Sequence, residues 1–219
     1  MKVTFIEHSG FMVEMEQNVL LFDYYQGEIP SFDGSKTLYV FASHSHADHY
    51  DPAIWKLKEQ YKDIHYILSD DIKDNEGAVV MKAHEKKEVA GIEIETLRSN
   101  DMGVAFLVKV EEKTIYHAGD LNWWHWNGEP EEDNEYYKKT FQDEMKYLEG
   151  KKIGVQQGTT GDLAVTDEFG DESVERYNKG FEAVQALTQA RSTQWLLIDL
   201  PAQEFVKQSE AEDSGRCLQ

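Results

Sequence analysis

The sequence contains a single cysteine, Cys217, among its 219 residues. One cysteine cannot form a disulfide within the chain, so nothing indicates an oxidising compartment. No apolar run approaches the ~20 residues that a membrane-spanning helix needs. The first residues, MKVTFIEHSGF, also lack the long apolar segment of a signal peptide. We therefore expect a cytoplasmic protein that does not insert into a membrane.

Positive charge is scarce as well. Lys and Arg total 22 against 42 Asp and Glu, which gives a formal net charge of −20. A field of this sign repels the phosphate backbone of nucleic acids and anionic lipid surfaces. We therefore expect neither nucleic acid nor membrane as a partner, and a small molecule as the substrate. The oligomeric state stays open.

Histidine is rare but clustered. Three of the eight histidines fall in HSHADH, residues 44–49, directly after the apolar run TLYVFAS. His44 and His46 alternate, so on extended backbone their rings point to the same side, and Asp48 and His49 follow in a turn. Imidazole and carboxylate are ligands that zinc prefers, and they also suit manganese and iron. A polar turn after a strand is the alternative, but the motif favours a metal site.

The rest of the first two thirds has the pattern of a layered α/β domain. Eight segments alternate or are apolar throughout, which predicts strands at KVTFIEH, FMVEME, NVLLFDYY, TLYVFAS, IHYILS, GIEIETL, VAFLVKV and KTIYHAG. Helical spacing predicts helices over residues 51–63 and 132–150. No internal repeat or linker is evident, so we expect one domain over residues 1–219, with the sheets inside.

The sequence changes in character after Lys152. Residues 153–173 are rich in Gly, Thr, Asp and Gln and have no clear period. Apolar residues at three- and four-residue steps predict a helix over 174–190, and WLLI predicts a strand over 194–200. The polar tail, residues 208–219, is expected to fray. We expect residues 153–219 to form an atypical closing segment of the domain.

Several motifs together carry a family resemblance. HSHADH resembles the His-x-His-x-Asp-His signature of the metallo-β-lactamase superfamily. IEHSGFMVEMEQNVLLFDYY is similar to the opening hairpins of that superfamily, with Asp23 in the place of its early structural aspartate. KTIYHAGDLNWW resembles a segment of the small lactonase-like branch, which includes relatives of ascorbate-6-phosphate lactonase. The resemblance covers about residues 1–152; a divergent ending or a change of reading frame would both explain why it stops there.

The resemblance implies an α/β fold, specifically an αββα sandwich of two mixed β-sheets flanked by helices, with metals at one edge of the sheets. It implies that His44 and His46 hold a first metal, that Asp48 and His49 hold a second, and that Asp120 bridges the two. The cofactor would be one or two Zn²⁺ ions, with Mn²⁺ or iron as alternatives. A metal-bound hydroxide, oriented by Asp48, would hydrolyse an ester, lactone, amide or phosphoester bond.

Two departures from the family pattern leave the site incomplete. Members usually have another histidine shortly before the Gly-Asp segment, where this chain has Arg98 and Ser99. They also have a late histidine, whereas this chain has none after His125. The nearest candidates at the late position are Asp199, Gln203 and Glu204. Three alternatives stay open: a single metal, substitute ligands from elsewhere, or a vestigial metal-binding member with little catalytic activity.

Three further histidines are candidates for a role near the site. His125 lies among three tryptophans, in NWWHWNGEP, and is either part of a packed aromatic cluster or a catalytic residue, as general acid or replacement ligand. We take Asp48 and His125 as the catalytic candidates. His8, in a turn after the first strand, either lines the site or bonds to a loop, and we favour the structural role. His117 is expected to support Asp120 rather than to bind metal.

Overall fold

The computed structural model describes residues 1–100, 102–122, 124, 128, 130–146, 153–158, 160–178 and 195–196. The chain divides into two compact units, Met1–Glu149 and Gly150–Gln219, and each is described by itself. The expectation of one domain over residues 1–219 stays a prediction. His125 and the tail, residues 208–219, lie outside the described residues.

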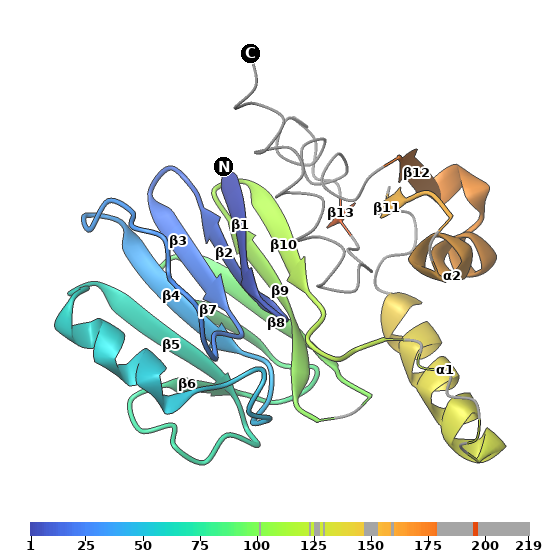
Figure 1. The fold of residues 1–219 in the computed structure, drawn as a ribbon, viewed down its shortest axis with the longest axis horizontal. Coiled ribbons are helices and arrows are strands. Elements are labelled where there is room, and N and C mark those ends of the chain that lie inside the picture. The colour runs from blue at the N-terminus through green and yellow to red at the C-terminus, as the bar shows by residue number, and fades with distance from the viewer. Residues whose placement is uncertain are drawn as a thin grey trace, which may run out of the picture. The chain divides into compact units, whose positions relative to one another are not determined.

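The first unit contains a six-stranded mixed sheet (Figure 1). The strands follow one another in chain order: β1 (Lys2–Glu7), β2 (Gly10–Glu14), β3 (Asn18–Phe22), β4 (Thr37–Ala42), β5 (Ile64–Ser69) and β6 (Val79–Met81). Strands β1 to β3 are antiparallel, and β3 to β6 are parallel. The parallel strands β3, β4 and β5 are largely buried, which explains their nearly continuous apolar sequences.

A second, four-stranded antiparallel sheet has the order β10-β9-β8-β7. Its strands are β7 (Lys86–Val89), β8 (Ile92–Arg98), β9 (Val104–Val110) and β10 (Lys113–His117). The tight turn from β9 to β10 has positive φ at Glu111 and Glu112. The Glu111 carboxylate accepts hydrogen bonds from the backbone N–H groups of Glu16 and Gln17 and from Asn18 Nδ2. This residue therefore joins the end of one sheet to the β2–β3 turn of the other.

The main core lies between the two sheets. Phe22 and Phe41 stack within the first sheet, with ring centroids 4.7 Å apart, and Phe41 meets Phe106 of the second sheet at 5.2 Å. Successive residues of a strand point to opposite faces, so Val19 and Leu21 join a separate core on the outer face of the first sheet.

Helical elements flank the sheets of the first unit. The 3₁₀ helix η1 (Pro52–Glu59) begins at Asp51, whose side chain caps the Ala53 N–H, and it buries Ile54 and Leu57 in the outer core. Helix α1 (Glu131–Met145) contacts β8. Two packed sheets with few helices confirm the expected α/β sandwich.

Three strand ends bring the functional segments together. Asp23 follows β3, the HSHADH segment begins two residues after β4, and Asp120 follows β10. Gly119 allows a close approach here, because it has φ 54° and an added Cβ would lie 2.7 Å from Ser43 Cβ and Oγ. Only glycine fits this backbone without displacing Ser43.

The second unit contains a small parallel sheet in the order β12-β11-β13. Its elements are β11 (Ile153–Gln156), α2 (Thr160–Phe169), the 3₁₀ turn η3 (Asp171–Ser173), β12 (Val174–Tyr177) and β13 (Trp195–Leu196). The predicted helix over 174–190 is wrong at its start, because residues 174–177 pair with β11 as a strand; residues 179–190 lie outside the described part. Of the predicted strand over 194–200, the structure describes only residues 195–196, which form β13.

Candidate metal centre

The HSHADH segment forms the loop between β4 and η1. His44 and His49 are buried, at 0% and 1% exposure, whereas His46 and Asp48 are exposed. The backbone N–H of His49 donates to His46 O at 3.0 Å, which closes the turn. The loop thus sends two imidazoles into the protein and leaves one imidazole and one carboxylate at its surface.

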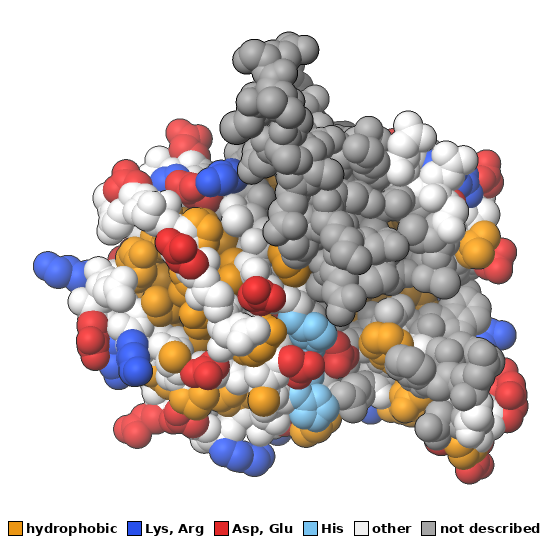
Figure 2. All heavy atoms as spheres, viewed as in Figure 1, with side chains coloured by type: hydrophobic (Ala, Val, Ile, Leu, Met, Phe, Trp, Pro, Cys, Tyr) orange, Lys and Arg blue, Asp and Glu red, His pale blue; other side chains and the backbone are white. Residues whose placement is uncertain are grey.

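Two groups of donor atoms lie at this loop, and within each group the atoms are within 4.8 Å of one another. The first group combines His44, His46 and Asp120, with His44 Nε2 3.6 Å from Asp120 Oδ2. On the face drawn in Figure 2, histidine and acidic side chains gather at one place.

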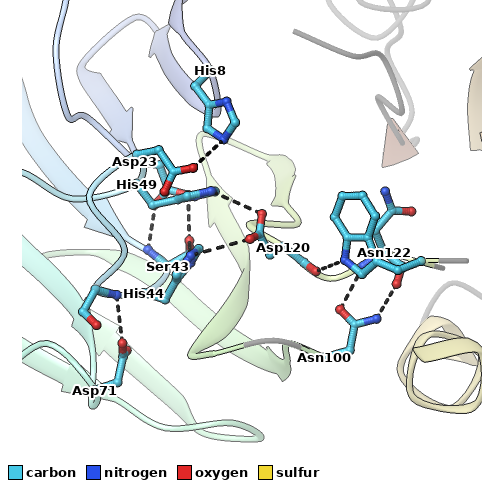
Figure 3. Close-up of polar contacts among 12 residues, drawn as sticks. His8, Asp23, Ser43, His44, His49, Asp71, Asn100, Asp120 and Asn122 are labelled. Atoms are coloured by element: carbon cyan, nitrogen blue, oxygen red, sulfur yellow. Dashed lines mark hydrogen bonds and ion pairs between the residues drawn. The ribbon is translucent and has the colours of Figure 1, made fainter. Parts of the chain in front are cut away.

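The second group combines His8, Asp48 and His49. His8 Nε2 lies 3.2 Å from Asp48 Oδ2, and the rings of His8 and His49 meet edge to face. Asp120 Oδ1 lies 3.2 Å from His49 Nε2, so the two oxygens of Asp120 face the two buried histidines, one each (Figure 3). This carboxylate is therefore placed between the two donor groups.

Asp23 orients both buried imidazoles of the HSHADH loop. Its buried carboxylate accepts from the N–H and Oγ–H of Ser43, from His49 Nδ1 and from His117 Nε2, at 2.7–2.8 Å. Since the Ser43 hydroxyl donates its only proton to Asp23, it must accept from His44 Nδ1, 3.0 Å away. Both buried rings are thus protonated at Nδ1, which leaves Nε2 for another ligand.

The network sets the charges of these groups. Burial alone would raise the pKa of Asp23, but His117 and His49 outweigh it and hold this pKa well below its usual range. Burial would lower the pKa of His49, but the carboxylates of Asp120 and Asp23 raise it to about 10. The pKa of His44 is lowered by burial and by the positive charge of His49. A cation that binds His49 must therefore displace a proton.

The residues present fit a metal ion. The buried Nε2 atoms of His44 and His49 have no hydrogen-bond partner within the described residues. Such an atom costs about 1–3 kcal/mol when nothing satisfies it. The donor separations of 3.2–3.6 Å are close to the ~3.0–3.4 Å expected for two ligands that share one ion at bond lengths of ~2.0–2.1 Å. Imidazole and carboxylate donors suit zinc, manganese and iron.

The structure brings all five residues expected to bind metal into these two groups: His44, His46, Asp48, His49 and Asp120. It also adds His8, for which we favoured a structural role. The one signal for His8 in the sequence was its position in the turn after the first strand. The second catalytic candidate, His125, cannot be placed, because it lies outside the described residues.

Other residues brace the loop that carries Asp120. Near the position of the absent family histidine, the buried Asn100 donates through Nδ2 to Asn122 O and accepts from Asn122 N at 3.3 Å. The indole of Trp124 donates to Asp120 O, also at 3.3 Å. His117 differs from the expectation, because it bonds to Asp23 rather than to Asp120.

Comparison with known proteins agrees with the motif. The family model described as a β-lactamase superfamily domain matches residues 2–127. The fold is similar to that of Igni18, a metallo hydrolase from Ignicoccus hospitalis KIN4/I, with 16% identity over 91% of this chain and 94% of that one, and a TM-score of 0.49. A candidate metal-dependent hydrolase from Parabacteroides distasonis ATCC 8503 is 18% identical over 89% of this chain and 91% of that one, with a TM-score of 0.49.

A candidate metal-dependent hydrolase from Veillonella parvula DSM 2008 is 13% identical over 91% of this chain and 97% of that one, with a TM-score of 0.46. All three TM-scores are below 0.5. None of the helices that the structure describes combines the length and the apolar composition of a membrane-spanning segment. That this chain belongs to the lactonase-like branch stays a prediction. The family model matches more than half of the sequence, and the chain therefore belongs to the β-lactamase superfamily.

Proposed function

We propose that this protein is a metal-dependent hydrolase that acts on a small molecule. One observation carries the proposal: the Nε2 atoms of His44 and His49 are buried, lack a hydrogen-bond partner among the described residues, and each face one oxygen of Asp120. A carboxylate flanked by two such imidazoles provides donors for two cations and reduces the repulsion between them.

Each residue has a distinct role in this proposal. His44, His46 and Asp120 hold the first ion, and Asp48 and His49 contribute to a second. When bound, the ion supplies Lewis acidity, which polarises the substrate and makes water acidic near neutral pH. Asp48 is exposed beside these donors, so it can accept a proton from the attacking water and orient it. His125 is proposed as a general acid or an additional ligand.

Zinc suits these donors best, and manganese or iron would fit them too. The bond cleaved is an ester, lactone, amide or phosphoester, because all four react with an activated water and the fold does not fix the choice. The net charge of −20 disfavours an anionic polymer as substrate.

The test combines metal content with activity. Purified protein is assayed on an aryl ester, a lactone, an amide and an aryl phosphodiester, before and after removal of metal by a chelator. We expect hydrolysis of at least one class, loss on chelation, and recovery with Zn²⁺, Mn²⁺ or Fe²⁺.

A single substitution sharpens this test. His46→Ala should remove most bound metal and the hydrolysis while the fold remains, because His46 is exposed on a loop. His65→Ala is the control, since His65 also has a nearby carboxylate, Asp63 at 3.3 Å, but belongs to neither donor group. Full activity of His46→Ala on the same substrate would rule out the proposed mechanism.

A second candidate is a metal-binding member of the fold with little catalytic activity. The observation in its favour is Asn100, which stands near the position of a usual ligand histidine and is satisfied by hydrogen bonds to Asn122. This alternative predicts a protein that binds metal through His46 but hydrolyses none of the four classes.

A further inference from the structure

His8 lies far from the HSHADH loop in sequence but next to it in the structure. It occupies the turn between β1 and β2, just after a register shift between Phe5 and Glu7. Its Nε2 lies 3.2 Å from Asp48 Oδ2, and its ring centroid lies 5.2 Å from that of His49 at an interplanar angle of 88°. Figure 3 shows the His8 ring directed toward this group.

We infer that His8 is a metal ligand and completes a second cation position together with Asp48 and His49. This inference rests on the proposed function, because it assigns one more ligand to the same centre. The family resemblance implies a late histidine as a further ligand here, and this chain has no histidine after His125. In the structure, the missing imidazole comes from the opposite end of the chain.

An independent observation points to a ligand at this place. His49 is 1% exposed, its Nδ1 is committed to Asp23, and its Nε2 has no hydrogen-bond partner within the described residues. The ion-pair contact of this atom with Asp120, at 3.2 Å, does not have hydrogen-bond geometry. A cation among His8, Asp48 and His49 would satisfy the buried nitrogen.

The donor set and spacing also suit a cation better than a simple ion pair. Two imidazoles and one carboxylate form a ligand set known for zinc, and one donor atom from each residue lies within 4.8 Å of the others. The His8 and Asp48 side chains are 45% and 55% exposed, so an isolated ion pair between them would contribute little.

The two positions should differ in affinity. Each position includes one buried histidine, but two of the three residues at the second position are exposed, whereas only His46 is exposed at the first. Exposed ligands lose more freedom when they bind, and water competes with them for the ion. The ion at the second position should therefore be the weaker one and the first to be removed by a chelator.

The backbone of His8 dictates the choice of variants. Its φ is 49°, in the left-handed region, which asparagine and glycine tolerate well. His8→Asn and His8→Gly therefore remove the imidazole and keep the turn. His84→Asn is a matched control, because His84 has φ 61°, is exposed, and has its own carboxylate partner, Glu144, at 2.9 Å, but belongs to neither donor group.

The experiment is a calorimetric titration of the metal-free full chain with Zn²⁺, with bound zinc counted after dialysis. We expect two ions per chain in the wild type and in His84→Asn. In both His8 variants the second ion should bind at least ~10-fold more weakly, while the first is unchanged. Circular dichroism checks that the variants stay folded.

The other outcomes separate the two proposals. If both His8 variants bind two ions as the wild type does, the inference is wrong. If the wild type binds one ion that His46→Ala removes, the inference fails and the proposed function stands. If the wild type binds no ion, both fail.

Discussion

Replacing Asp23 by asparagine removes the negative charge at the centre of the network but hardly changes the volume of the side chain. The carboxylate accepts four hydrogen bonds, from Ser43 N and Oγ, His49 Nδ1 and His117 Nε2. The amide of asparagine has one oxygen with two lone pairs, and its NH₂ group would face a donor. Asp23→Asn must therefore leave at least one of these buried donors without an acceptor.

The loss of unfolding free energy in Asp23→Asn follows from the burial of these groups and from the raised pKa of His49. A rise of this pKa from 6.5 to about 10 corresponds to about 5 kcal/mol in favour of the protonated ring. Asp120 and Asp23 both stabilise the protonated ring, so removing one of the two carboxylates should remove about half of this stabilisation. Breaking a buried pair costs about 3–5 kcal/mol in other proteins. We expect the metal-free variant to lose about 3 kcal/mol of unfolding free energy at pH 7.

The pH dependence gives a second, independent readout. Because the pKa of His49 is raised in the folded state, its contribution to stability is fully present below pH 6.5 and is lost as pH rises through about 10. The metal-free wild type should lose stability between pH 7 and pH 10, and Asp23→Asn should lose less over this range. Urea unfolding followed by circular dichroism at pH 7, 8.5 and 10 measures both effects.

Asp63→Asn is the control for this experiment, since Asp63 is exposed and lies 3.3 Å from His65. It should change the unfolding free energy by less than about 0.5 kcal/mol. If Asp23→Asn stays within about 1 kcal/mol of the wild type at pH 7 and keeps its pH slope, Asp23 does not stabilise these imidazoles.

Two further predictions concern the contact between the two sheets at Glu111 and the loop that carries Asp120. Glu111→Gln weakens the three hydrogen bonds between the β9–β10 and β2–β3 turns, so it should cost about 1–2 kcal/mol in urea unfolding. Burial would raise the pKa of Glu111, but those hydrogen-bond donors lower it. The difference in unfolding free energy between Glu111→Gln and the wild type should therefore be full above pH 4.5 and shrink as pH falls. An undiminished difference at pH 3 would contradict this. Gly119→Ala places a Cβ 2.7 Å from Ser43 at φ 54°, so it should shift Asp120 and weaken metal binding about tenfold or more, as metal titration would show. Unchanged binding would mean that the loop has room for the methyl group.

The parts of the centre that the sequence predicted are those fixed by local backbone. His44, His46, Asp48 and His49 are near neighbours in the chain, so the end of one strand and one turn suffice to bring them together. The strands were predictable for a similar reason, because β3 and β4 are buried on both faces and are therefore apolar throughout.

The parts that the sequence did not predict depend on contacts between distant segments. His8 approaches Asp48 only because the β1–β2 hairpin pairs with β3 beside the loop that follows β4. Val174 and Tyr177 have helical spacing, but pairing with β11 outweighs that preference. Strand β7, with the sequence KKEV, was missed because edge strands carry charges and lack a clear alternation.

Metal content per chain tests the central claim most directly: that the two buried imidazoles and Asp120 form a metal centre. The full chain is dialysed against Zn²⁺ and then against metal-free buffer, and bound metal is measured by mass spectrometry. The account predicts close to two ions per wild-type chain, and loss of the more tightly bound ion in His46→Ala. A wild-type value near zero with Zn²⁺, and again with Mn²⁺ and Fe²⁺, would contradict it.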